Sequence, residues 1–283
     1  MKAFISVLFL LLLFVFFYIV SPKKENHASI VVSVSPLESF AQRIVQGKMP
    51  TYALVHAGQN HETYELSPKE MLLLANAKIF FSTDFPFEMK LCEKLKELNP
   101  NITLVDLPKE IFADEKVKDL HIWTSLRLAQ EIAKVMVESI VRIDPANEKL
   151  YRKGYEELTR DLAALGKEVE KKLSRFRGKK IYVVHPAWGY FLKEYGLEEV
   201  SIEKEGKEPT LQDLVSIIEA AKKDKVRVIF IQKGTGIRGA NALARAVHGK
   251  VEEIDPLEED YFSNIRTVSS KIQKALENEK ADH

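Results

Sequence analysis

Short apolar segments alternate with helical segments along most of this 283-residue chain, and this alternation constrains the fold more than any other feature. The apolar segments form two groups, one in each half of the chain: 29–34, 52–56, 78–82 and 102–105, then 180–184, 226–231 and 250–254. Because most of them are almost continuously apolar, these strands are expected to be buried on both faces, as in a parallel sheet covered by helices. The sequence therefore predicts an α/β protein with two β/α lobes and parallel sheets.

A long helical pattern separates the two groups of strands. Asp144 and Pro145 provide an N-cap and a first-turn proline, and apolar residues then recur every three or four positions from Tyr151 to Phe176. A helix over 146–176 would be about 45 Å long, enough to run along both lobes and limit their hinging. We therefore expect three parts after residue 28: an N-terminal lobe (29–144), a backbone helix (145–178) and a C-terminal lobe (179–283).

The chain begins with an apolar run, residues 3–20, that has no polar face. In a helix this run would span about 27 Å, close to the thickness of the hydrocarbon core of a bilayer. Such a run is typical of a secretory signal or of an uncleaved N-terminal anchor, and both interpretations stay open because no clear cleavage site follows it. Residues 1–28 are therefore expected to be a signal or anchor plus a polar tether. The remainder would lie outside the cytoplasmic membrane, secreted, periplasmic or tethered.

Charge and cysteine content exclude several classes of protein. Lys and Arg total 42 and Asp and Glu total 41, a balance that does not indicate binding to nucleic acid or to an anionic membrane surface. Cys92 is the only cysteine, which excludes an intrachain disulfide and a multi-thiolate zinc or iron–sulfur site. Any metal site in this chain must therefore use nitrogen and oxygen donors.

Three of the seven histidines lie in loops at the ends of predicted strands or helices. His61 follows the second strand, His121 precedes a helix, and His185 comes directly after strand 180–184. Asp255 follows strand 250–254 in the same manner. Because ligands bind in the crevice at the carboxyl ends of parallel strands, we expect these four donors to converge between the lobes. Three neutral imidazoles and one carboxylate suit zinc or manganese, with an affinity that falls in acid.

Five short motifs follow one another in order along the chain: NHETYE (60–65), DLHIW (119–123), HPAWGY (185–190), EPT (208–210) and IDPL (254–257). Together they resemble the motifs of metal-binding solute-binding proteins of bacterial zinc and manganese ABC importers, over about residues 29–278. The resemblance implies two β/α lobes, a long backbone helix and a metal site in the interlobe cleft. The ligands that it implies are the four donors already identified. Asp119 and Glu65 would be hydrogen-bond partners that orient the imidazoles.

The sequence departs from the family pattern in two ways. Asn60 and Leu120 stand where the family usually has proline, so the two ligand loops are expected to be less stiff. The acidic, His-rich loop of many zinc members is missing between His61 and His121, which leaves the identity of the metal open. In the family, a histidine at the position of His185 goes with zinc, whereas a glutamate there goes with manganese. The resemblance therefore favours zinc, with manganese as the alternative.

The resemblance implies a carrier and not an enzyme. The chain is expected to be a monomer that captures one divalent ion and delivers it to an ABC permease in the membrane. Two alternatives stay open. An exported zinc-dependent hydrolase would need an open metal position and a general acid or base, and no HExxH motif is present. A cobalamin- or haem-binding protein of similar architecture would use at most two axial ligands, so four converging donors argue against it.

Overall fold

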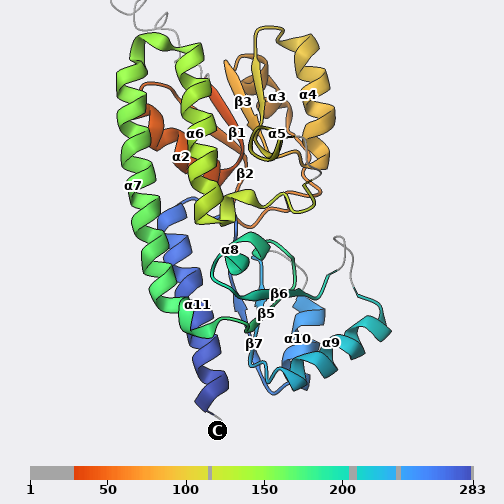
Figure 1. Ribbon diagram of the computed structural model, residues 1–283. Coiled ribbons are helices and arrows are strands. Elements are labelled where there is room, and N and C mark those ends of the chain that lie inside the picture. Colours follow the sequence, from red (N-terminus) through yellow and green to blue (C-terminus); the bar gives the residue numbers. More distant parts are fainter. Residues whose placement is uncertain (1–28, 114–116, 204–208, 234–236, 282–283) are drawn as a thin grey trace, which may run out of the picture.

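The computed structural model describes residues 29–113, 117–203, 209–233 and 237–281 (Figure 1). The apolar run at 3–20, the tether that follows it and Glu208 of the EPT motif lie outside these ranges. Within them, no helix combines the length and the apolar character needed to cross a bilayer.

Two four-stranded parallel sheets form the centres of two lobes. The first sheet has the order β2-β1-β3-β4, with strands Thr51–Val55, Ile30–Val34, Ile79–Ser82 and Thr103–Asp106. The second has the order β6-β5-β7-β8, with strands Glu198–Ser201, Lys180–Val183, Val228–Ile231 and Lys250–Glu253. The predicted α/β architecture with two lobes is confirmed. Strand β6 is an addition, because its sequence EEVS is too polar to be recognised as a strand.

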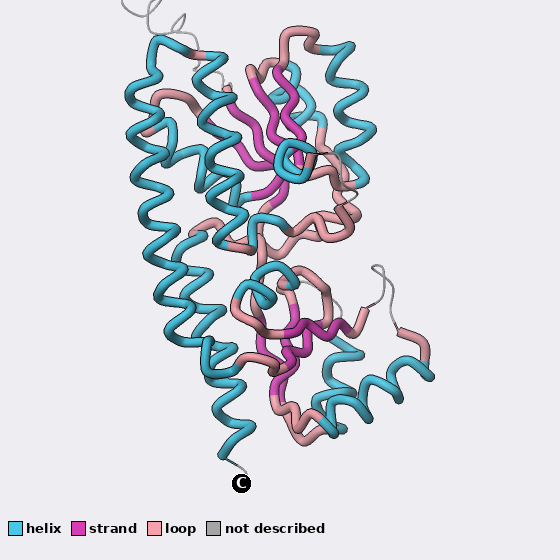
Figure 2. Tube along the Cα trace, in the orientation of Figure 1, coloured by secondary structure: helices cyan, strands magenta, loops and turns pink. Residues whose placement is uncertain are grey.

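Helices cover the faces of both sheets (Figure 2). Those of the first lobe are α2 (Ser35–Val45), α3 (Pro68–Ala75), α4 (Pro86–Leu98), α5 (Leu107–Phe112), the 3₁₀-helix η1 (Ile122–Thr124) and α6 (Leu126–Ile143). Those that follow β5 are α8 (Gly189–Glu194), α9 (Leu211–Lys223), α10 (Ile237–Ala246) and α11 (Tyr261–Ala281).

The predicted backbone helix is α7 (Glu148–Leu173), extended at its two ends by the 3₁₀-helices η2 (Pro145–Asn147) and η3 (Ser174–Phe176). It packs on α2 and α6 of the first lobe and on α11 of the second, and in Figure 1 it runs along one side of the molecule. Its buried residues recur at the helical period: Tyr151, Gly154, Leu158, Leu162, Leu165, Val169 and Leu173. One helix therefore packs against both lobes from the same side. The predicted boundaries of the three parts, after residues 144 and 178, stay a prediction.

Parallel pairing aligns the carboxyl ends of the strands within each sheet. Val34 pairs with Val55 in the first sheet, and Val183 pairs with Ser201 in the second. The loops that follow these strands therefore start from one edge of each sheet, and the two edges meet where the lobes contact each other.

A short segment after β8 fixes the second lobe to the first. The indole Nε1–H of Trp123 donates to the carbonyl of Pro256 over 2.8 Å, and the hydroxyl of Tyr261 donates to the carbonyl of Trp123 over 2.9 Å. The hydroxyl of Ser35 donates to the carbonyl of Leu257. All of these contacts are buried, so they join the two lobes away from solvent.

Candidate metal centre

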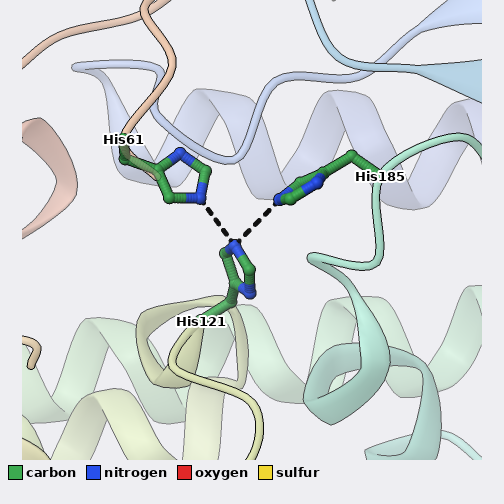
Figure 3. A group of neighbouring side chains, drawn as sticks. All are labelled: His61, His121 and His185. Carbon is green, nitrogen blue, oxygen red and sulfur yellow. Dashed lines mark hydrogen bonds between the residues drawn. The ribbon is translucent and has the colours of Figure 1, made fainter. Parts of the chain in front are cut away.

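The imidazoles of three histidines point toward one another between the lobes (Figure 3). Nε2 of His61 lies 2.8 Å from Nε2 of His121, and Nε2 of His185 lies 3.2 Å from the same atom of His121. The three rings offer ligand atoms within 4.8 Å of one another, and all three side chains are buried. The structure thus brings together three of the four donors predicted from the sequence.

Aromatic side chains of the first lobe support the rings of His61 and His121. The ring of His61 lies 4.7 Å from that of Phe85, centroid to centroid, and the ring of His121 lies 5.4 Å from that of Trp123. The short helix η1 starts directly after His121, and the Thr124 hydroxyl donates to the carbonyl of His121 over 2.8 Å. His121 is therefore held by a turn, and both rings pack against aromatic side chains.

Carboxylates select the tautomer of two rings. Nδ1 of His121 lies 2.8 Å from a carboxylate oxygen of Asp119, and Nδ1 of His185 lies 3.3 Å from one of Glu203. Since a carboxylate only accepts hydrogen bonds, each of these rings carries a proton on Nδ1, and in the neutral ring Nε2 is then left with a free lone pair. The two lone pairs face each other and repel. A cation bound by both would remove this repulsion, so the donor set fits a metal ion.

Burial also keeps the rings in the form that binds a metal. Desolvation, together with the neighbouring His121 and His185, lowers the pKa of His61 to about 2. Burial lowers the pKa of His121 too, although Asp119 opposes that shift. Both imidazoles are consequently neutral near pH 7, and Nδ1 of His61 is buried without a hydrogen-bond partner.

Asp255, the fourth predicted donor, does not belong to the group of converging ligand atoms. It is 5% exposed, and its two carboxylate oxygens each accept a backbone N–H over 2.9 Å, one from Gly58 and one from Leu257. Gly58 belongs to the loop after β2, so the carboxylate ties the second lobe to the first. A metal-binding role for Asp255 stays a prediction.

The predicted partners of the imidazoles lie in different surroundings. Asp119 contacts His121 as expected, whereas Glu65 is exposed on the loop before α3. Sequence reasoning missed Glu203, because it follows the unrecognised strand β6. It also missed Glu62, whose carboxylate oxygen lies 3.9 Å from Nε2 of His185. The only signal for Glu62 was its position beside His61 in the NHETYE motif.

Known proteins resemble this chain over nearly all of the described residues. A sequence model of one family, described as the zinc-uptake complex component A, periplasmic, matches residues 30–275. The high-affinity zinc uptake system protein ZnuA of Bacillus subtilis is 26% identical over 255 residues, which cover 83% of this chain and 80% of that protein. A crystal structure of ZnuA matches with a TM-score of 0.82 and 29% identity, over 88% of this chain and 99% of that one. The periplasmic zinc-binding protein TroA of Treponema pallidum, at 19% identity and over 87% and 98% of the two chains, shares the fold with a TM-score of 0.79.

Proposed function

The chain belongs to the family of the periplasmic component A of zinc-uptake complexes, and on this premise we propose that it captures one zinc ion outside the cytoplasm and delivers it to an ABC permease in the membrane. The observation that carries the proposal is the convergence of three buried imidazoles whose Nε2 atoms face one centre. The metal is the cargo of the protein, and the membership of the family argues for a carrier and against an enzyme.

The donor set supports zinc over manganese. Imidazole nitrogens suit zinc, whereas manganese prefers carboxylate, carbonyl and water oxygens. His61, His121 and His185 would bind zinc through Nε2, and the fourth ligand would be a carboxylate, for which the sequence predicts Asp255. A manganese carrier remains the second candidate, because a carboxylate in the site would serve that metal as well.

Zinc affinity of single-histidine variants tests the site. We expect the wild-type protein to hold one zinc per chain in elemental analysis and to prefer zinc in competition with manganese. His121→Ala and His61→Ala should each lose more than the roughly 10- to 100-fold in affinity that removing a hydrogen-bond partner of a ligand costs. His56→Ala is the matched control, because His56 lies in the same loop after β2 as His61 but contacts Glu259 and does not belong to the converging group of histidines. Full zinc stoichiometry and affinity in His121→Ala would refute the proposal.

Delivery to a permease is tested in cells. Zinc-limited growth of a strain that lacks this protein should be restored by the wild type and not by His121→Ala. Hydrolytic turnover by the zinc-loaded protein, lost on the same substitution, would instead favour an exported hydrolase. Visible absorption of the purified protein would indicate a haem or cobalamin carrier.

A further inference from the structure

We propose that Glu88 is a positioning residue of the metal centre: it fixes the loop after β3, and through that loop it places the ring of Phe85 against the imidazole of His61. Glu88 lies in α4 and belongs to none of the five motifs that point to the metal site. The inference rests on the proposed metal-binding function and concerns how one of the ligands is kept in the orientation that binds an ion.

Among the described residues, His61 is the one imidazole of the site whose Nδ1 has no hydrogen-bond partner. In His121 and His185 this atom lies within hydrogen-bonding distance of a carboxylate. A histidine that binds metal ordinarily donates its second N–H to such a partner, which fixes the orientation of the ring. The ring of His61 must therefore be oriented by the side chains that it packs against.

The ring of Phe85 packs directly on the ring of His61. Their centroids are 4.7 Å apart and their planes are inclined at 56°, whereas the ring of Trp123 lies 6.3 Å from that of His61. Phe85 is buried, and its ring also lies 5.9 Å from that of His121. Because Phe85 is buried against both imidazoles, its position limits how far the ring of His61 can turn.

Glu88 holds the backbone from which Phe85 projects. One oxygen of its carboxylate, Oε2, accepts the N–H of Phe85 over 2.8 Å and the N–H of Thr83 over 3.0 Å. The bond to Phe85 is that of a capping box at the start of α4, but the bond to Thr83 reaches two residues further back into the loop. Between them Asp84 has a φ of 66°, a left-handed conformation that the surrounding hydrogen bonds must support. Glu88 therefore sets the path of the chain at Phe85.

The burial of Glu88 costs stability, which the capping of one helix does not require. The side chain is 1% exposed, and its second oxygen, Oε1, has no hydrogen-bond partner within the described ranges. Burial also raises the pKa of this carboxyl to about 7, because its charged form loses the solvation of water. Buried groups that are perturbed in this way are typical of residues that serve a functional site.

Zinc titration against a chromophoric chelator tests the role of Glu88. Glu88→Met removes the acceptor for both N–H groups and should lower the zinc affinity by at least about tenfold, as the loss of a partner that orients a ligand does. Glu88→Gln should recover most of this loss, because its amide oxygen can accept the same two N–H groups. Leu95→Ala is the matched control: Leu95 is buried in the same helix about two turns further on, so its loss destabilises the lobe but should leave the zinc affinity unchanged.

A double variant shows whether Glu88 acts through Phe85. Phe85→Leu keeps an apolar side chain in the core but removes the ring that packs on His61, and it should lower the zinc affinity by itself. In that background Glu88→Met should cause little further loss, because substitutions on one path are not additive. If the two losses multiplied instead, Glu88 would act independently of Phe85 and the inference would be refuted. Unchanged affinity in Phe85→Leu would refute it as well, even if Glu88→Met failed to fold.

His121→Ala separates failure of this inference from failure of the metal site itself. If His121→Ala loses zinc while Glu88→Met binds like the wild type, the metal site stands and the role of Glu88 is wrong. The same conclusion holds if Leu95→Ala loses as much affinity as Glu88→Met, because general destabilisation would then explain both losses. If His121→Ala keeps its zinc, the proposed function fails as well.

Discussion

Replacing Gly154 by alanine tests how closely the backbone helix α7 is held against the first lobe. A Cβ atom at this position would lie 2.5 Å from the carbonyl oxygen of Arg43 and 2.6 Å from that of Ile44, both in the last turn of α2. Real side chains do not approach backbone oxygens so closely, and backbone atoms cannot rotate away. The two helices would have to separate, at a cost near the upper end of the roughly 1–3 kcal/mol known for overpacked cores.

Gly166 in the same helix provides the matched control. The nearest atom to a Cβ there is a methyl carbon of Leu126 at 3.9 Å, which is an ordinary contact. Alanine is favoured over glycine within a helix by about 1 kcal/mol, so Gly166→Ala should raise the free energy of unfolding by up to that amount. Gly154→Ala gains the same propensity but loses about 3 kcal/mol in packing, which leaves a net destabilisation of about 2 kcal/mol.

Urea denaturation of the metal-free protein, followed by circular dichroism and by tryptophan fluorescence, measures both effects. The two substitutions should change the free energy of unfolding in opposite directions. If Gly154→Ala were as stable as Gly166→Ala or more stable, the close crossing of α2 and α7 would be wrong, and with it the account of α7 as a helix fixed to the first lobe.

Three further predictions concern buried polar groups. The pKa of His61 is about 2 in the folded chain and near 6.5 in the unfolded chain, so between these values only the unfolded chain gains the proton. Acid should therefore destabilise the metal-free wild type. Between pH 7.5 and pH 5, urea titrations should show its free energy of unfolding falling by about 2 kcal/mol more than that of His61→Asn. Burial raises the pKa of Glu88 to about 7, so its ionisation favours the unfolded chain from about pH 4.5 upward. Glu88→Gln keeps an acceptor for the N–H of Thr83, and its free energy of unfolding should rise by about 3 kcal/mol relative to that of the wild type between pH 4.5 and pH 8. A difference that does not change with pH would contradict this. Trp123→Phe removes the donor to the carbonyl of Pro256 and should lower the free energy of unfolding by about 1–3 kcal/mol in chemical denaturation. Proteolysis between the lobes should become faster. Unchanged stability would show that this hydrogen bond does not hold the lobes together.

The architecture was predictable because most strands are apolar on both faces. Strand β1 is buried at every position, and the same holds for β3 and β7, so the composition of each segment reports its place in a covered sheet. Strand β6 was missed for the complementary reason. It lies at the edge of its sheet, pairs only with β5 and contains two glutamates. Strand β8, at the opposite edge, also contains two glutamates and was predicted, so the apolar signal is weak at both edges of this sheet without being a reliable guide at either.

The three histidines were predictable from their position in loops at the cleft, but the geometry that makes them a site was not. The 2.8 Å approach of His61 to His121 depends on how the loop after β2 packs on Phe85. The hydrogen bond from His185 to Glu203 depends on strand β6, which brings Glu203 beside β5. Tertiary packing sets these distances, and no spacing along the chain encodes them.

Asp255 shows where positional reasoning reaches its limit. It follows β8 and lies beside the first lobe, as expected for a residue at the carboxyl edge of a parallel sheet. That position predicts which part of the fold surrounds the Asp255 side chain, but it does not predict the hydrogen-bond partner. Backbone N–H groups at the same edge of the sheet can also bind a carboxylate. Gly58, which has a positive φ of 77°, lies in the turn that directs its N–H at Asp255. The Asp255 carboxylate is thus held by backbone donors of both lobes, an arrangement that its place in the sequence does not encode.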